Sequence, residues 1–251
     1  TLVVTTSVSG NTVETISVLK DAMKKNCKII AFSSGGKIIN ICEKNKIEHR
    51  IIPRYINPRT SLVAYLYSML KVLQPIIPIT KKEVKDSIIK LEKTRKNISS
   101  KNLHSNNLSL KLAEAMSKIP VVYFPYGLGA AAIRFKNSLE ENSKMHIIIE
   151  DVIEACHNGI VSWENYSKDV RPILIQGKND NIKTKKHWLV LKEYFATKKI
   201  KYKEVNSLEG NILSKIINLI YLLDYATIYR AIINQNDPSP VIAIDFMKKR
   251  V

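Results

Sequence analysis

Short apolar runs alternate with longer amphipathic segments along the first part of the chain. The runs are rich in Val and Ile, as in strands, and the segments between them repeat apolar residues at helical spacing. The predicted strands are Leu2–Thr5, Lys28–Phe32 and Glu48–Ile52, and the predicted helices are Asn11–Lys25, Ile38–Cys42 and Leu62–Leu73. Strands that alternate with helices in this way predict a parallel sheet covered on both faces.

The same alternation returns after a charged helix, Thr80–Lys96, and a polar stretch, Asn97–Asn107, which we interpret as a linker. The predicted strands are Pro120–Phe124, Met145–Glu150, Arg171–Gln176 and Lys201–Val205, and the predicted helices are Leu108–Ser117, Ala130–Leu139, Lys185–Thr197, Asn211–Ile233 and Val241–Arg250. We therefore expect an α/β protein with two tandem doubly wound, flavodoxin-like domains, at residues 1–103 and 104–251.

The chain is strongly basic, with 40 Lys and Arg against 22 Asp and Glu, a net charge of +18. Such a charge suggests a nucleic-acid partner. The basic runs 81–96 and 183–203 carry few aromatic residues, however, and Tyr194, Phe195 and Tyr202 are spaced equally well for a core. We expect no specific nucleic-acid binding, only weak, salt-sensitive adsorption to polyanions.

Cysteine usage and hydropathy indicate the cellular setting. The chain has 3 cysteines and no CxxC pair, which argues against a disulfide scaffold or a zinc site and favours the cytoplasm. Polar residues interrupt the apolar run Ile212–Leu223, so we expect no membrane span. The chain opens directly on a predicted strand at Thr1, and we expect that a further segment precedes it in the natural protein.

Hydroxyl side chains fill the loop between the first strand and the first helix, from Ser7 to Thr12. Ligands bind at this edge of open α/β sheets, and backbone N–H groups at a helix start attract anions. The loop has no P-loop lysine, so a Walker-type nucleotide site is excluded. The alternative is plain capping of the helix by Ser9 or Asn11, with Thr12 and Glu14 in the first turn.

Several motifs occur in a fixed order over nearly the whole chain. They are Ser7-Val8-Ser9-Gly10-Asn11-Thr12, Ser33-Ser34-Gly35-Gly36-Lys37, Asn57-Pro58-Arg59-Thr60, Glu141-Asn142-Ser143-Lys144, Cys156-His157-Asn158 and Ile244-Asp245-Phe246-Met247-Lys248. The first pair resembles the sugar isomerase (SIS) domain, and the series resembles the bifunctional phosphoglucose/phosphomannose isomerase family. Val8 and Gly159 depart from the family pattern, which usually has an aromatic residue and a Glu there.

The resemblance implies tandem SIS domains, the first lacking an N-terminal segment with a Gly-Gly-Ser loop. It implies a cofactor-independent enzyme of glycolysis and gluconeogenesis that interconverts glucose 6-phosphate and mannose 6-phosphate with fructose 6-phosphate. Ser7, Ser9 and Thr12 would bind the substrate phosphate.

The resemblance also assigns catalytic roles. Glu141 would be the base, Arg59 would stabilise the enediolate, and His157 and Lys248 would open the sugar ring. His157 would reach into a neighbouring subunit, which implies a homodimer. On residue type and position alone, each of these residues also fits an ordinary surface or loop position.

Two other functions remain open at this point. Gly127-Leu128-Gly129-Ala130-Ala131-Ala132 matches GxGxxA after a strand, with Glu150 and Asp151 after the next strand, as in a dinucleotide-dependent oxidoreductase. A non-catalytic SIS protein that senses a sugar phosphate would keep the hydroxyl loop but would not need Glu141, His157 and Arg59.

Overall fold

The structure, a computed structural model, describes residues 1–116, 118–248 and 250. Its internal contacts divide the chain into two compact units, residues 1–80 and 81–251. The domain boundary predicted after residue 103 stays a prediction. Ser117 and Lys249, which fall in two predicted helices, lie outside the described residues.

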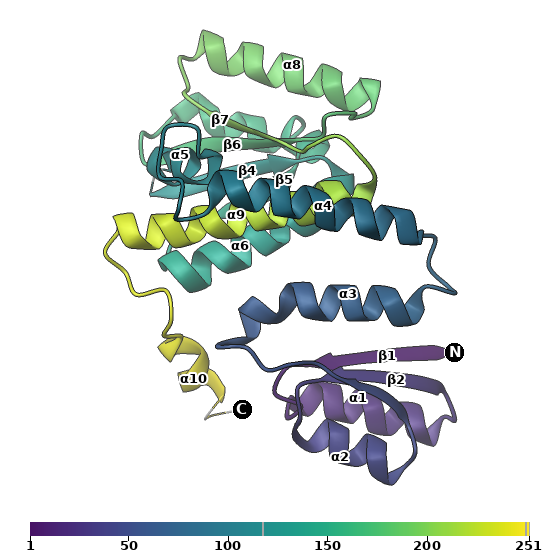
Figure 1. The fold of residues 1–251 in the computed structure, drawn as a ribbon. Helices are drawn as coiled ribbons and strands as arrows, with labels where there is room; N and C mark the ends of the chain where they lie inside the picture. Colours follow the sequence, from purple (N-terminus) through teal and green to yellow (C-terminus); the bar gives the residue numbers. More distant parts are fainter. Residues whose placement is uncertain (117, 249, 251) are drawn as a thin grey trace. The chain divides into compact units, whose positions relative to one another are not determined.

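The first unit is a parallel sheet in the order β1-β2-β3. Its elements are β1 (Leu2–Ser7), α1 (Val13–Lys24), β2 (Lys28–Ser33), α2 (Gly36–Lys44), β3 (Glu48–Ile51), η1 (Pro58–Ser61) and α3 (Leu62–Leu73). Helices α1 and α2 cover one face, where Leu19 and Ile38 pack on Ala31 (Figure 1). On the other face Tyr65 of α3 packs on Phe32. Both faces are covered, as the alternation of strands and helices predicts.

The second unit is a parallel sheet in the order β5-β4-β6-β7. Its strands are β4 (Ile119–Phe124), β5 (Ile148–Asp151), β6 (Val170–Gln176) and β7 (Lys203–Asn206). Its helices are α4 (Lys81–Ile98), α5 (Leu108–Ala115), η2 (Tyr126–Leu128), α6 (Gly129–Ser143), α7 (Val152–Ala155), η3 (Gly159–Asn165), α8 (Ile182–Thr197), α9 (Ile212–Ile233) and α10 (Ile242–Lys248). Helix α8 lies on one side of the sheet, and α6 and α9 lie on the other (Figure 1). The predicted α/β fold with parallel sheets is confirmed.

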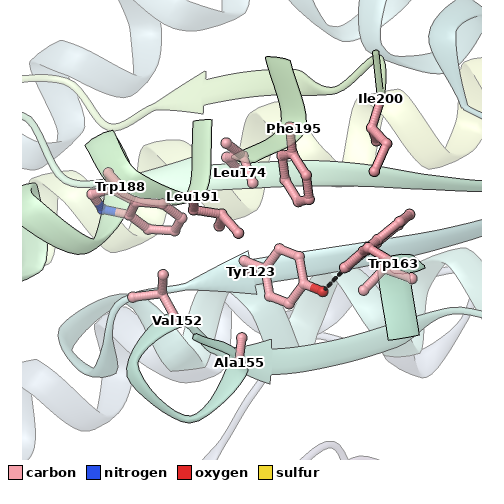
Figure 2. Close-up of a cluster of buried hydrophobic side chains, with 10 residues drawn as sticks. Tyr123, Val152, Ala155, Trp163, Leu174, Trp188, Leu191, Phe195 and Ile200 are labelled. Atoms are coloured by element: carbon pink, nitrogen blue, oxygen red, sulfur yellow. Dashed lines mark hydrogen bonds between the residues drawn. The ribbon is translucent and has the colours of Figure 1, made fainter. Parts of the chain in front are cut away.

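An aromatic cluster forms the core beneath α8 (Figure 2). Trp188, Leu191 and Phe195 lie on the buried face of this helix at helical spacing. The Trp163 indole donates a hydrogen bond of 2.7 Å to the Tyr123 hydroxyl. This bond gives the buried indole N–H and the buried hydroxyl a partner in each other. Burial raises the pKa of Tyr123 to about 12, so its hydroxyl stays protonated at neutral pH.

The polar stretch 97–107, interpreted above as a linker, is part of the second unit and is held there by buried hydrogen bonds. Asn107 is fully buried; its side chain donates to the Ile98 carbonyl at 3.1 Å and accepts from Leu110 N–H at 3.0 Å, which caps α5. The Tyr229 hydroxyl of α9 donates to the same Ile98 carbonyl at 2.7 Å. The polar side chains therefore anchor α4 and α5 to α9.

Helix α9 is the central helix of the second unit. It packs against α4, α5 and α6. Among the described helices it is the one with the length and hydropathy of a membrane span, and 56% of its apolar window is buried inside the unit, as in the core helix of a globular fold.

Candidate functional site

The hydroxyl loop between β1 and α1 folds back on itself. The hydroxyl oxygens of Ser7 and Thr12 lie 2.8 Å apart, and Gly10 N–H donates to Ser7 Oγ at 3.1 Å. Ser9 lies on the exposed rim of the loop, where its Oγ accepts from Asn11 N–H at 3.2 Å. The structure thus brings Ser7 and Thr12 together and leaves Ser9 at the mouth of the loop.

These side chains do not cap helix α1. Thr12 is the N-cap residue, and its side chain makes no capping bond. The Asn11 side chain accepts instead from Lys37 N–H of α2 at 3.1 Å. The capping interpretation is therefore wrong for Ser9 and Asn11, and Thr12, predicted in the first turn, is the N-cap residue itself. A helix start without a side-chain cap, beside two hydroxyls, suits an anion better than a purely structural turn.

Two glycines allow the loops after β1 and β2 to interlock. Gly10 and Gly36 have φ values of +68° and +76°. A Cβ on Gly10 would overlap the Gly35 carbonyl oxygen, and one on Gly36 would overlap the Ser9 carbonyl oxygen. Ser33 Oγ donates to the Ser7 carbonyl at 2.7 Å. The loop shape therefore depends on backbone approach at these two positions, which any side chain would prevent.

Tyr65 of α3 also holds this loop, and sequence reasoning missed it. Its hydroxyl lies 3.1 Å from Ser34 Oγ and 3.5 Å from the Ser7 carbonyl oxygen. Burial raises the pKa of Tyr65, so the hydroxyl stays a donor. The sequence feature that could have indicated this role is the Tyr65 hydroxyl, a polar group in a predicted helix that is mostly apolar.

Arg59 lies half-buried in η1 of the same unit. The Asn57 side chain caps this turn by accepting a hydrogen bond from Thr60 N–H at 3.2 Å.

Glu141 is a half-buried residue near the end of α6, beside the C-terminal segment. A cavity of about 480 Å³ separates them. It is lined by Asn137, Glu140, Glu141, Lys144 and residues 240–244. Lys144 ends the helix in the left-handed conformation, with φ 55°, and its Nζ donates to the Glu141 carbonyl and to the Pro240 carbonyl, the latter at 2.8 Å. Lys144 therefore ties the start of α10 to the end of the helix that carries Glu141.

Buried polar contacts fix the end of α6 on α9. Asn142 Nδ2 donates to Thr227 Oγ1 at 2.8 Å, and Ser143 Oγ donates to the Thr227 carbonyl at 2.7 Å. Earlier in the helix, Arg134 forms an ion pair of 2.9 Å with Asp224. These contacts hold the Glu141 backbone in place, which a precisely placed base requires.

His157 and Lys248 lie elsewhere in the second unit. His157 is exposed after α7 and lines a separate cavity of about 560 Å³ with Cys156, Lys186 and His187. Lys248 is exposed in the last turn of α10. The structure brings Glu141 together with the first turn of α10, and it places His157 at another cavity. Over the residues that the structure describes, no group of three His, Cys, Asp or Glu side chains is arranged to hold a metal ion.

In the turn from Gly127 to Gly129, close packing explains why a glycine stands at position 129. A Cβ on Gly129 would lie 3.2 Å from the Phe124 ring, whereas one on Gly127 would meet open space. Neither glycine has a positive φ. The turn thus packs α6 closely against β4, and its geometry gives no support of its own to a dinucleotide loop.

Relatives that are similar in sequence to this chain carry the name of a phosphosugar isomerase. Residues 105–251 match the family described as bacterial phospho-glucose isomerase C-terminal SIS domain. A bifunctional phosphoglucose/phosphomannose isomerase of Caldicellulosiruptor bescii is 29% identical over 261 residues, which cover 100% of this chain and 76% of that protein. One of Thermoplasma acidophilum is 28% identical, over 98% of this chain and 74% of that protein.

Solved structures share the fold. A hypothetical protein from Thermus thermophilus aligns with a TM-score of 0.79 at 12% identity, over 99% of this chain and 70% of that chain. A tagatose-6-phosphate ketose/aldose isomerase from Escherichia coli aligns with a TM-score of 0.72 at 13% identity, over 95% of this chain and 70% of that chain. The family match over residues 105–251 shows that the chain belongs to the bacterial phospho-glucose isomerase C-terminal SIS domain family, and its full-length relatives carry the name bifunctional phosphoglucose/phosphomannose isomerase.

Proposed function

We propose that the protein is an aldose–ketose isomerase that interconverts glucose 6-phosphate and mannose 6-phosphate with fructose 6-phosphate. The observation that carries the proposal is the family relationship, which extends over the whole chain and includes the hydroxyl loop. The uncapped start of α1 beside Ser7 and Thr12 supports a phosphate-binding role for that loop.

The chemistry requires a base that removes the C2 proton of the sugar and returns it at C1 through an enediol. We assign this role to Glu141, since a carboxylate can both accept and return a proton. Ser7, Ser9 and Thr12 would bind the phosphate, and the planar Arg59 guanidinium would stabilise the enediolate oxygens. His157 and Lys248 would move the ring-oxygen proton and open the ring.

The exposed position of His157, outside the cavity that Glu141 lines, supports its use by a second copy of the chain. We therefore propose a homodimer in which His157 completes the partner's site. The enzyme would act in the cytoplasm, in glycolysis and gluconeogenesis, without a cofactor.

A coupled assay tests the proposal. The protein should form fructose 6-phosphate from glucose 6-phosphate and from mannose 6-phosphate. Glu141→Gln should lower kcat by about 10³-fold or more on both substrates, because the base is lost. Glu140→Gln is the matched control, since Glu140 is paired with Lys136 at 2.8 Å on the same helix, and its rate should change less than twofold.

Two results would contradict the proposal. Full turnover by Glu141→Gln would remove Glu141 as the base. Saturable sugar-phosphate binding without turnover of either sugar would instead indicate a sensor.

A further inference from the structure

The second unit repeats, at the ends of β6 and β7, the arrangement found at the ends of β1 and β2. In each unit the first strand runs through a loop and a helix into its parallel neighbour, and the last paired residues are Ser7 with Ser33 and Gln176 with Asn206. In the first unit the Ser33 side chain donates to the Ser7 carbonyl, and in the second unit the backbone N–H of Ser207 donates to the Gln176 carbonyl at 2.8 Å. Ligand crevices lie at this edge of parallel sheets.

A cavity of about 680 Å³ occupies that crevice in the second unit. Its size falls in the usual range of small-molecule sites. The loop after β6, the loop after β7 and one side of α8 form its walls. Glu141 and His157 line other cavities, so the proposed isomerase chemistry does not use this one.

The loop after β6 is held rigid by its own hydrogen bonds. Asp180 Oδ2 accepts from Gly177 N–H at 2.9 Å and from the Trp188 indole at 3.0 Å, and Ser207 Oγ accepts from Lys178 N–H at 3.1 Å. The Gly177 and Trp188 N–H groups satisfy Asp180 Oδ2, although they carry no net charge against its carboxylate. The walls are therefore preorganised, which lowers the entropic cost of binding a ligand.

One buried donor in this cavity has no use in the fold. Ser207 is 3% exposed, and its hydroxyl donates no hydrogen bond to any residue that the structure describes. Buried hydroxyl groups normally satisfy their hydrogen. A ligand acceptor in the cavity would satisfy this one.

Three lysines, Lys178, Lys185 and Lys192, and two carboxylates, Asp180 and Glu209, line the cavity. Of its lining lysines, Lys178 is paired with Glu209 at 3.1 Å and Lys192 with Glu204 at 2.6 Å. Lys185 forms no ion pair with any described carboxylate. An ammonium group and a hydroxyl donor that line one cavity favour an anion with several acceptor oxygens.

We propose that this cavity is a second anion site, which takes a small phosphorylated or carboxylated metabolite. The site is distinct from the hydroxyl loop and from the isomerase residues. Lys185 would supply the charge, and Ser207 would donate to the ligand.

Calorimetric titration with inorganic phosphate, at constant ionic strength, tests the proposal. The full chain would carry Ser9→Ala and Thr12→Ala, which remove hydroxyls from the loop of the first unit. We expect saturable binding in this background. Lys185→Met should weaken it about tenfold, the loss of one charge-assisted contact, and Ser207→Ala should weaken it less. Lys186→Met is the control; Lys186 is the next residue of α8 and lines the His157 cavity, so binding should change less than twofold.

Absence of saturable binding in the loop variant would overturn the proposal. Equal losses in Lys185→Met and Lys186→Met would also overturn it, since they would indicate diffuse attraction to a basic surface. Sugar turnover is measured separately in the coupled assay. Failure of the isomerase proposal would therefore be visible independently of failure here.

Discussion

The hydroxyl loop of the first unit and the end of α6 in the second unit are held in place by different means. The loop depends on backbone: two glycines at positive φ let neighbouring loops touch, and short hydroxyl side chains close the turn. The end of α6 depends on side chains: Asn142 and Ser143 bond to α9, and Lys144 reaches the C-terminal segment. A site for an anion can use backbone N–H groups, whereas a base must be a side chain on a fixed helix.

The largest effect should come from the loop. Gly10→Ala adds a Cβ that overlaps the Gly35 carbonyl, at a residue with φ +68°. We expect a loss of about 3 kcal/mol or more in unfolding free energy and loss of sugar-phosphate binding. Gly127→Ala is the control, because its Cβ meets open space, and its thermal unfolding should change little. Equal stability of both variants would contradict the interlocked loop.

The next effect should come from the ion pair under α6. Asp224→Ala removes the partner of Arg134 and the acceptor of Ser138, which lies 2.6 Å away. We expect a loss of about 2 to 3 kcal/mol, because a half-buried guanidinium loses its carboxylate partner. Glu92→Ala breaks an exposed pair with Arg95 and should leave the midpoint of chemical denaturation nearly unchanged. Similar losses of stability in Asp224→Ala and Glu92→Ala would contradict the expectation that the Arg134–Asp224 pair stabilises the fold more than an exposed pair.

A smaller and more local effect is expected at Lys144. Asn tolerates the left-handed conformation, so Lys144→Asn keeps the helix end and removes only the ammonium contacts. Hydrogen exchange in residues 240–248 should rise, kcat/KM should fall by about tenfold, and the overall stability should change by about 1 kcal/mol or less. Lys136→Met, on the same helix, should leave exchange in 240–248 unchanged. Unchanged exchange in Lys144→Asn would show that Lys144 does not hold this segment.

The smallest effect concerns pH. Burial and the nearby Glu154 raise the pKa of Glu150 above its ordinary value of 4.5. The unfolded chain then loses this proton first, so stability falls as the pH rises from about 4.5 through the higher folded-state pKa. Glu150→Gln should match wild type at pH 4 and exceed it by a few tenths of a kcal/mol at pH 7, given the partial exposure of the group. A less stable variant at pH 7 would show that the carboxylate makes favourable contacts.

Sequence patterns predicted most of the strands and long helices, since β1, β2, α1 and α9 carry clear apolar periodicity. They missed α7 and η3, because helices of 4 and 7 residues are too short for an apolar period to be detected. They also assigned Asn97–Asn107 to a linker, because the burial of Asn107 under Tyr229 depends on residues far apart in the chain.

The candidate site was predictable to a similar extent. The hydroxyl loop is local, and its residues are adjacent in sequence, so Ser7 and Thr12 could be paired from the motif. The cavity beside Glu141 could not be predicted, because it needs the segment from Pro240 to return to the end of α6. The support from Tyr65 was also hidden, since it depends on how α3 packs over the sheet.

The central claim is that Glu141 transfers the proton between C2 and C1. Proton NMR of the reaction in deuterated water tests it directly, because a base that exchanges with solvent places deuterium on the sugar. Wild type and Glu140→Gln should incorporate deuterium at C1 of fructose 6-phosphate formed from glucose 6-phosphate. Glu141→Gln should incorporate none above the uncatalysed rate. Incorporation by Glu141→Gln at the wild-type rate would contradict the account.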